Sequence, residues 1–184
     1  RGGGRGLLVV EQGVGGGVGA GAGRATLMRA GNQGIGQGRA MGYALRSCTP
    51  PTRGTSVFEI AEDAMEVGIV IHGEPGRQRT KLVGANEIVD LRLNAIVPDL
   101  PFVAGDEVAL MVNGLGGTTI AELYLLYGIA HKKLAEKGIK VFRSYVNEYC
   151  TSLEMAGASL PLCKVDAELK ELFLAPAEVS IRVF

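Results

Sequence analysis

The chain contains two histidines, and one of them has a setting that suits nucleophilic chemistry. His72 ends an apolar run, residues 65–72, and a stiff Gly-Glu-Pro-Gly turn (residues 73–76) follows it directly. The run predicts a short strand, so the imidazole would lie at a strand's carboxyl end, where α/β proteins bind ligands. His131 instead precedes two lysines in a polar stretch, which indicates solvent-exposed surface. Taken alone, a single histidine placed like His72 is more often a structural hydrogen-bonding group than a reactive one.

A second candidate is the glycine-rich sequence NGLGGTT at residues 113–119, between an apolar run and a helical pattern. Backbone N–H groups in such a loop, aided by the dipole of the following helix, can hold an anion. Asn113, Gly114, Gly116 and Gly117 are the residues that would contact such a ligand. The loop lacks the Gly-Lys-Ser/Thr ending of a Walker A motif, and many strand-to-helix turns are glycine-rich for steric reasons alone. A plain turn is therefore the simpler interpretation.

The third candidate lies near the start of the chain, where residues 7–20 (LLVVEQGVGGGVGA) superficially resemble a dinucleotide-binding turn. That site needs an acid about 20 residues after the glycines to bind the ribose. After Glu11 the next carboxylate is Glu59, so this acid is missing. Low-complexity sequence explains the glycines better than a nucleotide site does.

The elements that must position these groups follow from the pattern of apolar residues. Residues 85–97 and 166–173 have helical spacing, and Thr119 with Glu122 forms a capping box that opens a helix ending near Lys137. Strands are predicted at 56–60, 65–72, 106–113, 139–146, 158–165 and 178–184. The strand, helix and strand between 106 and 146 form a crossover unit, which predicts a parallel strand pair. The fold class is therefore α/β, with a mixed sheet flanked by helices.

The composition separates two parts of the chain. Residues 1–42 hold 16 of the 28 glycines and five arginines against one acid, and they are either a mobile arm or a helix imposed by packing. Residues 43–184 have an ordinary composition and are predicted to form one compact domain. The segment 48–54 (CTPPTRG), just after this division, is a Pro/Gly connector and predicts a boundary there.

Charge and hydropathy exclude several classes of protein. The 19 basic and 19 acidic residues give a net charge of zero, which argues against a nucleic-acid-binding protein. No apolar run approaches the ~18 residues that cross a bilayer, and the N-terminus does not resemble a signal peptide. The cysteines at 48, 150 and 163 have no CxxC spacing, so we expect reduced thiols in a cytoplasmic protein rather than disulfides or a zinc site.

Three long segments together resemble one known family, the K subunit of dihydroxyacetone (glycerone) kinase, also called the DhaK domain. Residues 62–76 (EDAMEVGIVIHGEPG) closely resemble its signature, and residues 112–124 (VNGLGGTTIAELY) look like its next block. Residues 146–157 (VNEYCTSLEMAG), followed by LCKVD at 162–166, resemble the third. The order and spacing agree from about residue 41 to the end, which makes the resemblance specific.

The resemblance implies the second domain of the K fold and an unusual way of holding substrate. In this family the histidine of the IHGEPG motif, here His72, adds through a ring nitrogen to the carbonyl carbon of dihydroxyacetone and forms a hemiaminal. Gly73 and Glu74 would line the substrate. The family implies no cofactor on this part itself: ATP–Mg or a phosphorelay supplies the phosphoryl group through an L-type nucleotide-binding subunit or domain. It also implies a homodimer that acts in glycerol metabolism.

The chain departs from the family pattern at three positions and in its extent. Val70 and Asn147 stand where glycine is common, and Pro161 interrupts a predicted strand. The family's first domain, with its acid–base residues, would lie before Arg1, and the L domain would follow the end. We therefore expect a C-terminal half that does not turn over substrate alone. A non-catalytic regulatory relative and a decayed fragment are the alternatives.

Overall fold

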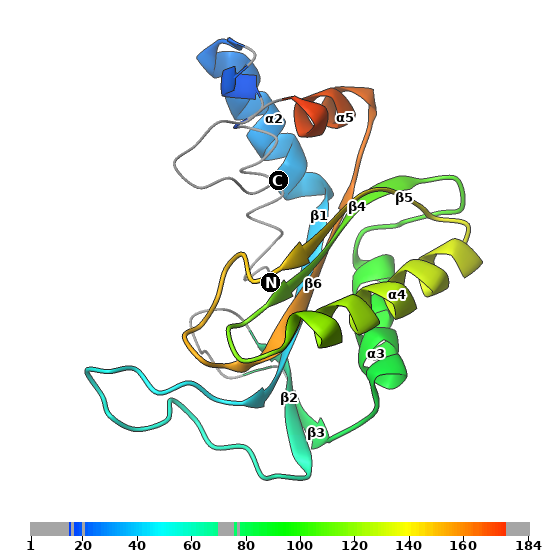
Figure 1. The fold of residues 1–184 in the computed structure, drawn as a ribbon. Coiled ribbons are helices and arrows are strands. Elements are labelled where there is room, and N and C mark those ends of the chain that lie inside the picture. The colour runs from blue at the N-terminus through cyan, green and yellow to red at the C-terminus, as the bar shows by residue number, and fades with distance from the viewer. Residues whose placement is uncertain (1–14, 16, 20, 70–75, 77, 176–184) are drawn as a thin grey trace.

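The computed structural model describes residues 15, 17–19, 21–69, 76 and 78–175, and they form a mixed sheet with helices on both faces (Figure 1). The elements are α2 (Arg24–Gln37), β1 (Gly38–Arg46), β2 (Ala64–Ile69), β3 (Gln78–Lys81), α3 (Ala85–Asp99), β4 (Glu107–Gly114), α4 (Ile120–Glu136), β5 (Lys140–Asn147), β6 (Ala156–Lys164) and α5 (Ala167–Leu174). The strand order is β3-β2-β1-β6-β4-β5. β4 and β5 are parallel and the other neighbours are antiparallel, which confirms the predicted mixed α/β class.

The crossover unit β4–α4–β5 forms where the sequence predicts it. Thr119 caps α4: its side chain accepts the backbone N–H of Glu122, and the Glu122 side chain accepts the N–H of Thr119. Leu123, Leu126, Ala130 and Leu134 place one apolar stripe of α4 in the core. After the helix the chain turns through Gly138, whose φ of 74° suits glycine. β5 then returns parallel to β4.

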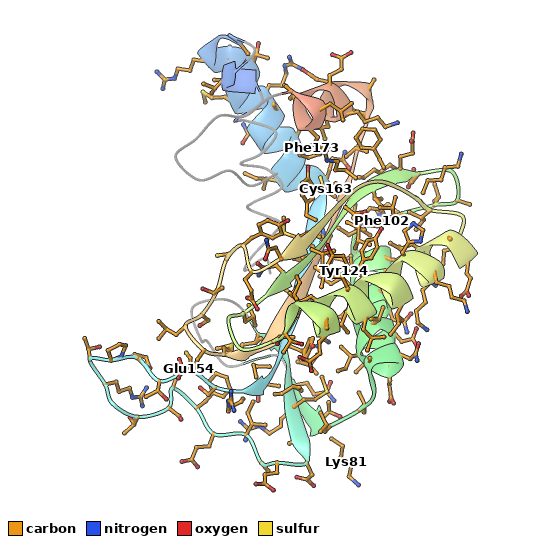
Figure 2. All side chains as sticks on the ribbon, viewed as in Figure 1. Lys81, Phe102, Tyr124, Glu154, Cys163 and Phe173 are labelled. Carbon is orange, nitrogen blue, oxygen red and sulfur yellow. The ribbon has the colours of Figure 1, made fainter. Side chains whose placement is uncertain are left out.

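Alternate residues of β4 face different helices, because successive side chains of a strand point to opposite faces. Val108, Leu110 and Val112 join the main core beneath α3 and α4. Ala109 and Met111 join a second cluster with α5 on the other face. Figure 2 shows Cys163 and Phe173, which both belong to this second cluster, at the α5 end of the sheet.

A third cluster closes the opposite end of that second face and corrects one predicted element. Residues 56–60 were expected to form a strand, but they have no regular structure. Val57, Phe58 and Ile60 instead pack against the buried cluster of Ala44, Cys48, Ile69, Leu115 and Met155. The apolar side chains of residues 56–60 cover the sheet, and the segment does not pair with a strand. The predicted strand is therefore wrong, because the apolar residues reflect burial rather than strand pairing.

Within the glycine-rich part of the chain, residues 24–37 form α2, the helix imposed by packing. Ala30 and Gly34 are buried, and contacts with α5 and its cap hold the helix: Arg29 pairs with Glu168 at 2.6 Å, and Gln33 donates to Asp166. β1 was not expected, and it runs across the division at residues 42 and 43 while pairing with β6 along its length. β3 was missed as well. The predicted strand 178–184 lies outside the described residues.

Pro161 sits inside β6, a strand with neighbours on both sides. It pairs with Ala40 of β1, while the pairing of β6 with β4 stops at Leu162 and resumes at Ser159. Proline has no N–H to give to the ladder, so the pairing pauses there without a change of register.

Among the described residues, no helix has the length and apolar character to cross a membrane. Cys48 and Cys163 are buried free thiols, and Cys150 is half-buried.

Candidate functional site

His72, Gly73 and Glu74 lie outside the described residues, and Ile69 and Gly76 are the nearest described residues on either side of them. Ile69, the last residue of β2, pairs with Gly42 of β1 and is buried. Gly76 packs directly on β2: a Cβ on this glycine would lie 2.5 Å from the carbonyl oxygen of Val67. Ile69 and Gly76, the described residues before and after positions 70–75, thus both lie against the sheet, and only glycine fits at position 76.

A buried carboxylate lies beside the second of these points. Glu66 is 6% exposed, and its Oε2 accepts a hydrogen bond from Nε of Arg79 on β3 at 3.0 Å. A Cβ on Gly76 would lie 2.7 Å from Cγ of Glu66. The Glu66–Arg79 ion pair thus ties β2 to the edge strand where the chain re-enters the sheet.

One row of paired residues connects the start of this segment with the loop 113–119. Gly42 pairs with Ile69 on one side and with Ser159 on the other, and Ser159 pairs with Asn113. Neighbouring strands are about 4.8 Å apart, so three steps separate Ile69 from Asn113 by about 14 Å. Ile69, three positions before His72 in the chain, therefore lies at the same level of the sheet as Asn113 of the glycine-rich loop.

The loop itself uses its N–H groups internally. The N–H of Leu115 donates to the carbonyl of Gly157 at 3.1 Å, and that of Gly117 donates to the carbonyl of Met155 at 2.9 Å. The N–H of Gly116 donates to Oε2 of Glu148 at 2.8 Å. These donors are committed to the protein's own acceptors, which supports the plain-turn interpretation of the loop over anion binding.

Asn113 holds two loops together rather than facing open space. It is 3% exposed, and its Nδ2 donates to the carbonyl of Cys150 at 2.9 Å and to Oγ of Ser159 at 3.3 Å. Its Oδ1 accepts from the N–H groups of Tyr149 at 2.9 Å and Cys150 at 2.8 Å. Every hydrogen-bonding direction of this amide is used, so the residue fixes the chain that follows β5.

Glu148 belongs to that chain and is a site residue that the sequence did not single out. Its carboxylate lies against Gly114, where a Cβ would be 2.2 Å from Oε1. Burial raises the pKa of Glu148, although the hydrogen bond from Gly116 acts to lower it. Oε1 is buried and has no hydrogen-bond partner. The signal for it was present: Glu148 stands in the block 146–157 that carries the family resemblance.

Comparison with known sequences decides the family. Residues 1–181 match the pattern described as the Dak1 domain. The chain belongs to the Dak1 domain family. The match spans the glycine-rich part as well as residues 43–184, which agrees with a β1 strand that pairs across the division between them.

Two curated relatives of this Dak1 chain come from Listeria innocua serovar 6a. The dihydroxyacetone-binding subunit DhaK of PTS-dependent dihydroxyacetone kinase 2 is 40% identical over 138 residues, 75% of this chain and 42% of the relative. The corresponding subunit of kinase 1 is 36% identical over 163 residues, 89% of this chain and 50% of the relative. The chain therefore spans half, or less, of the length of these relatives.

Two solved structures share the fold. The dihydroxyacetone kinase operon co-activator Dha-DhaQ superposes with a TM-score of 0.85 at 28% identity, over 91% of this chain and 52% of that one. The dihydroxyacetone kinase of C. freundii gives a TM-score of 0.81 at 22% identity, over 96% of this chain and 34% of that one. The second likeness concerns the fold alone.

A departure from the Dak1 pattern has a local role in this chain. Asn147, where the family resemblance leads one to expect glycine, ends β5, and its Oδ1 accepts the N–H of Glu148 at 2.9 Å. The side chain thereby caps the strand end and helps orient the Glu148 backbone. Val70, the other substituted glycine position, lies outside the described residues.

Proposed function

We propose that this chain is the ketone-holding part of a dihydroxyacetone-kinase-type protein, with His72 as the covalent anchor for dihydroxyacetone. The observation that carries the proposal is the 36–40% identity to dihydroxyacetone-binding subunits over most of the chain. The described flanks support it, because Ile69 pairs with β1 and Gly76 packs on β2. Gly73 and Glu74 are the residues proposed to lie beside the substrate.

The proposed chemistry is addition of a neutral imidazole to a ketone. The ring nitrogen gives its lone pair to the carbonyl carbon, and the C=O π electrons move to the oxygen. The oxygen takes up a proton and the other ring nitrogen releases one, so the hemiaminal forms without net gain or loss of protons. Only a carbonyl compound can react, so glycerol is rejected by chemistry rather than by shape.

Phosphoryl transfer requires a donor from outside this chain. We propose that ATP–Mg or a phosphorelay, carried by an L-type nucleotide-binding subunit or domain, phosphorylates the terminal hydroxyl while the ketone is held. Acid–base groups would come from the part of the relatives that this chain does not span. Catalysis in the cytoplasm by a homodimer is part of the same proposal, as is a role in glycerol metabolism.

A second candidate is a binding protein that keeps the ketone site and takes part in regulation. The observation that favours it is the TM-score of 0.85 to the operon co-activator Dha-DhaQ, at an identity of 28%. Such a protein would bind dihydroxyacetone without phosphorylating it. Substrate binding and phosphate transfer must therefore be tested separately.

The binding test follows the two imidazoles by NMR while excess dihydroxyacetone is added near neutral pH. His72 is expected to shift, whereas His131, exposed on α4, serves as an internal control. The shift should disappear in His72→Asn and with glycerol, and it should fade below an imidazole pKa of about 6.5. An unshifted His72, or an equal response to glycerol, would overturn the covalent anchor.

The transfer test adds an L-type subunit with ATP–Mg, or with a phosphorylated carrier protein, and measures dihydroxyacetone phosphate. Product that depends on His72 supports the kinase. A His72 shift without product under either donor supports the regulatory alternative.

A further inference from the structure

Arg92 places a positive charge in the buried space between α3 and the sheet. Arg92 of α3 is 1% exposed, and its Nε, Nη1 and Nη2 are all buried with no hydrogen-bond partner among the residues that the structure describes. Guanidinium groups in proteins stay protonated at neutral pH, and each carries five N–H donors in one plane. Burial lowers the pKa of Arg92 to about 10, which still leaves it charged at neutral pH.

One aromatic ring compensates part of this charge. The guanidinium carbon of Arg92 lies 4.9 Å from the centre of the Tyr43 ring. A ring attracts the face of the guanidinium, but the N–H donors point outward in its plane and gain nothing from this contact. The donors need acceptors of their own, since unpaired buried donors of a charged group are strongly unfavourable.

No carboxylate of the described residues fills that role. Glu122 acts electrostatically on Tyr43, but its carboxylate is held by the backbone N–H of Thr119 at 2.9 Å and by the Thr119 hydroxyl at 2.8 Å. Asp90, on the same helix as Arg92, pairs with Lys133 of α4 at 2.8 Å. The charge of Arg92 is therefore left without an acidic partner among these neighbours.

A small cavity lies beside the guanidinium. The space that a water-sized sphere can occupy is about 10 Å³, which is close to the room that one water needs. Apart from Arg92, Tyr43 and Ser159, its lining is apolar and includes Val89, Val112, Leu126 and Leu160. This space is too small for a carboxylate or a phosphate, and its walls are mostly apolar.

We propose that this cavity is a binding site for one monatomic anion of the chloride class, held by the N–H groups of Arg92. A water molecule would accept from the guanidinium and could donate to the hydroxyls of Tyr43 and Ser159, but a neutral water would leave the buried charge of Arg92 uncompensated. An anion needs only donors and also neutralises the buried charge. The bound anion holds α3 against the sheet through Arg92. This role is independent of ketone binding by the chain.

The test compares the stability of the protein in sodium chloride and in sodium gluconate at equal ionic strength. Ligand binding to the folded state alone makes the folded-to-unfolded ratio rise tenfold for each tenfold increase in chloride, once the site is saturated. This dependence is expected in chloride and absent in gluconate. Arg92→Met should abolish it, and Arg53→Met, which removes an exposed arginine in an irregular segment, should preserve it.

A second measurement keeps the proposal testable if Arg92→Met does not fold. Crystals of the wild-type chain grown in sodium bromide should show an anomalous bromide peak at the guanidinium of Arg92. A water at that position, no peak at all, the same stability in both salts, or a chloride dependence that survives in Arg92→Met would each overturn the proposal.

Discussion

The hydrogen bonds of Asn113 predict that Asn113→Ala destabilises the fold strongly. Alanine would leave the N–H groups of Tyr149 and Cys150 and the carbonyl of Cys150 without their partner. An unsatisfied buried backbone group costs about 1–3 kcal/mol, and these groups are only half-buried, so the lower end applies to each. The expected loss in free energy of unfolding is about 3 kcal/mol.

Urea unfolding measures this loss directly. With a denaturant slope of about 2 kcal/mol/M, the midpoint should fall by about 1.5 M. Asn94→Ala, which truncates an exposed asparagine on α3, is the matched control and should change stability by less than about 0.5 kcal/mol. In hydrogen exchange, the amides of Tyr149 and Cys150 should lose protection in Asn113→Ala.

The reasoning fails if Asn113→Ala and Asn94→Ala have equal midpoints. If Asn113→Ala instead keeps full stability and abolishes the His72 response to dihydroxyacetone, then Asn113 contacts substrate, which is the role that the sequence first suggested. The two roles thus give opposite results in the same pair of measurements.

Three further perturbations test the neighbouring contacts. Thr119→Ala should lower the free energy of unfolding by about 1 kcal/mol in urea, and NMR titration should show the pKa of Glu122 rising, because hydrogen bonds from Thr119 lower it. Burial raises the pKa of Glu148, so the folded state binds the proton more tightly, and wild-type stability should increase relative to Glu148→Gln as pH falls toward the carboxylate range. The opposite slope would contradict the burial of that carboxylate. Gly114→Ala should cost about 1–3 kcal/mol through collision with Glu148, and a double-mutant cycle with Glu148→Ala should recover most of that cost.

The parts of the fold that could be predicted from sequence are those in which local signals and packing agree. For α4, the capping box at Thr119 predicts the start of the helix and an end near Lys137, and the structure confirms the capping box and a helix over Ile120–Glu136. The parallel β4–β5 pair follows from the crossover rule. In these segments the tertiary structure keeps what the local sequence already favours.

The missed elements have the opposite property, because their structure depends on partners distant in sequence. β3 (Gln78–Lys81) is polar and mostly exposed, and it is a strand because β2 offers it an edge. α2 has few apolar residues and three internal glycines, and the groups that it contacts are distant in sequence: Ala30 and Gly34 are buried, and Arg29 pairs with Glu168 of α5. Residues 56–60 show the converse: they are apolar, but they cover the sheet without joining it.

Gly42 of β1 and Gly157 of β6 allow close packing of the sheet beside the candidate site. A Cβ at Gly42 would lie 2.7 Å from the carbonyl oxygen of Ile69, the last described residue before the His72 segment. A Cβ at Gly157 would lie 2.1 Å from the carbonyl oxygen of Tyr43. β1 can approach both neighbours only because these side chains are absent, so glycine at position 42 is a requirement of the sheet and not merely low-complexity sequence. Since β1 lies between β2 and β6, this close packing sets the spacing between the base of the histidine segment and the Asn113 loop.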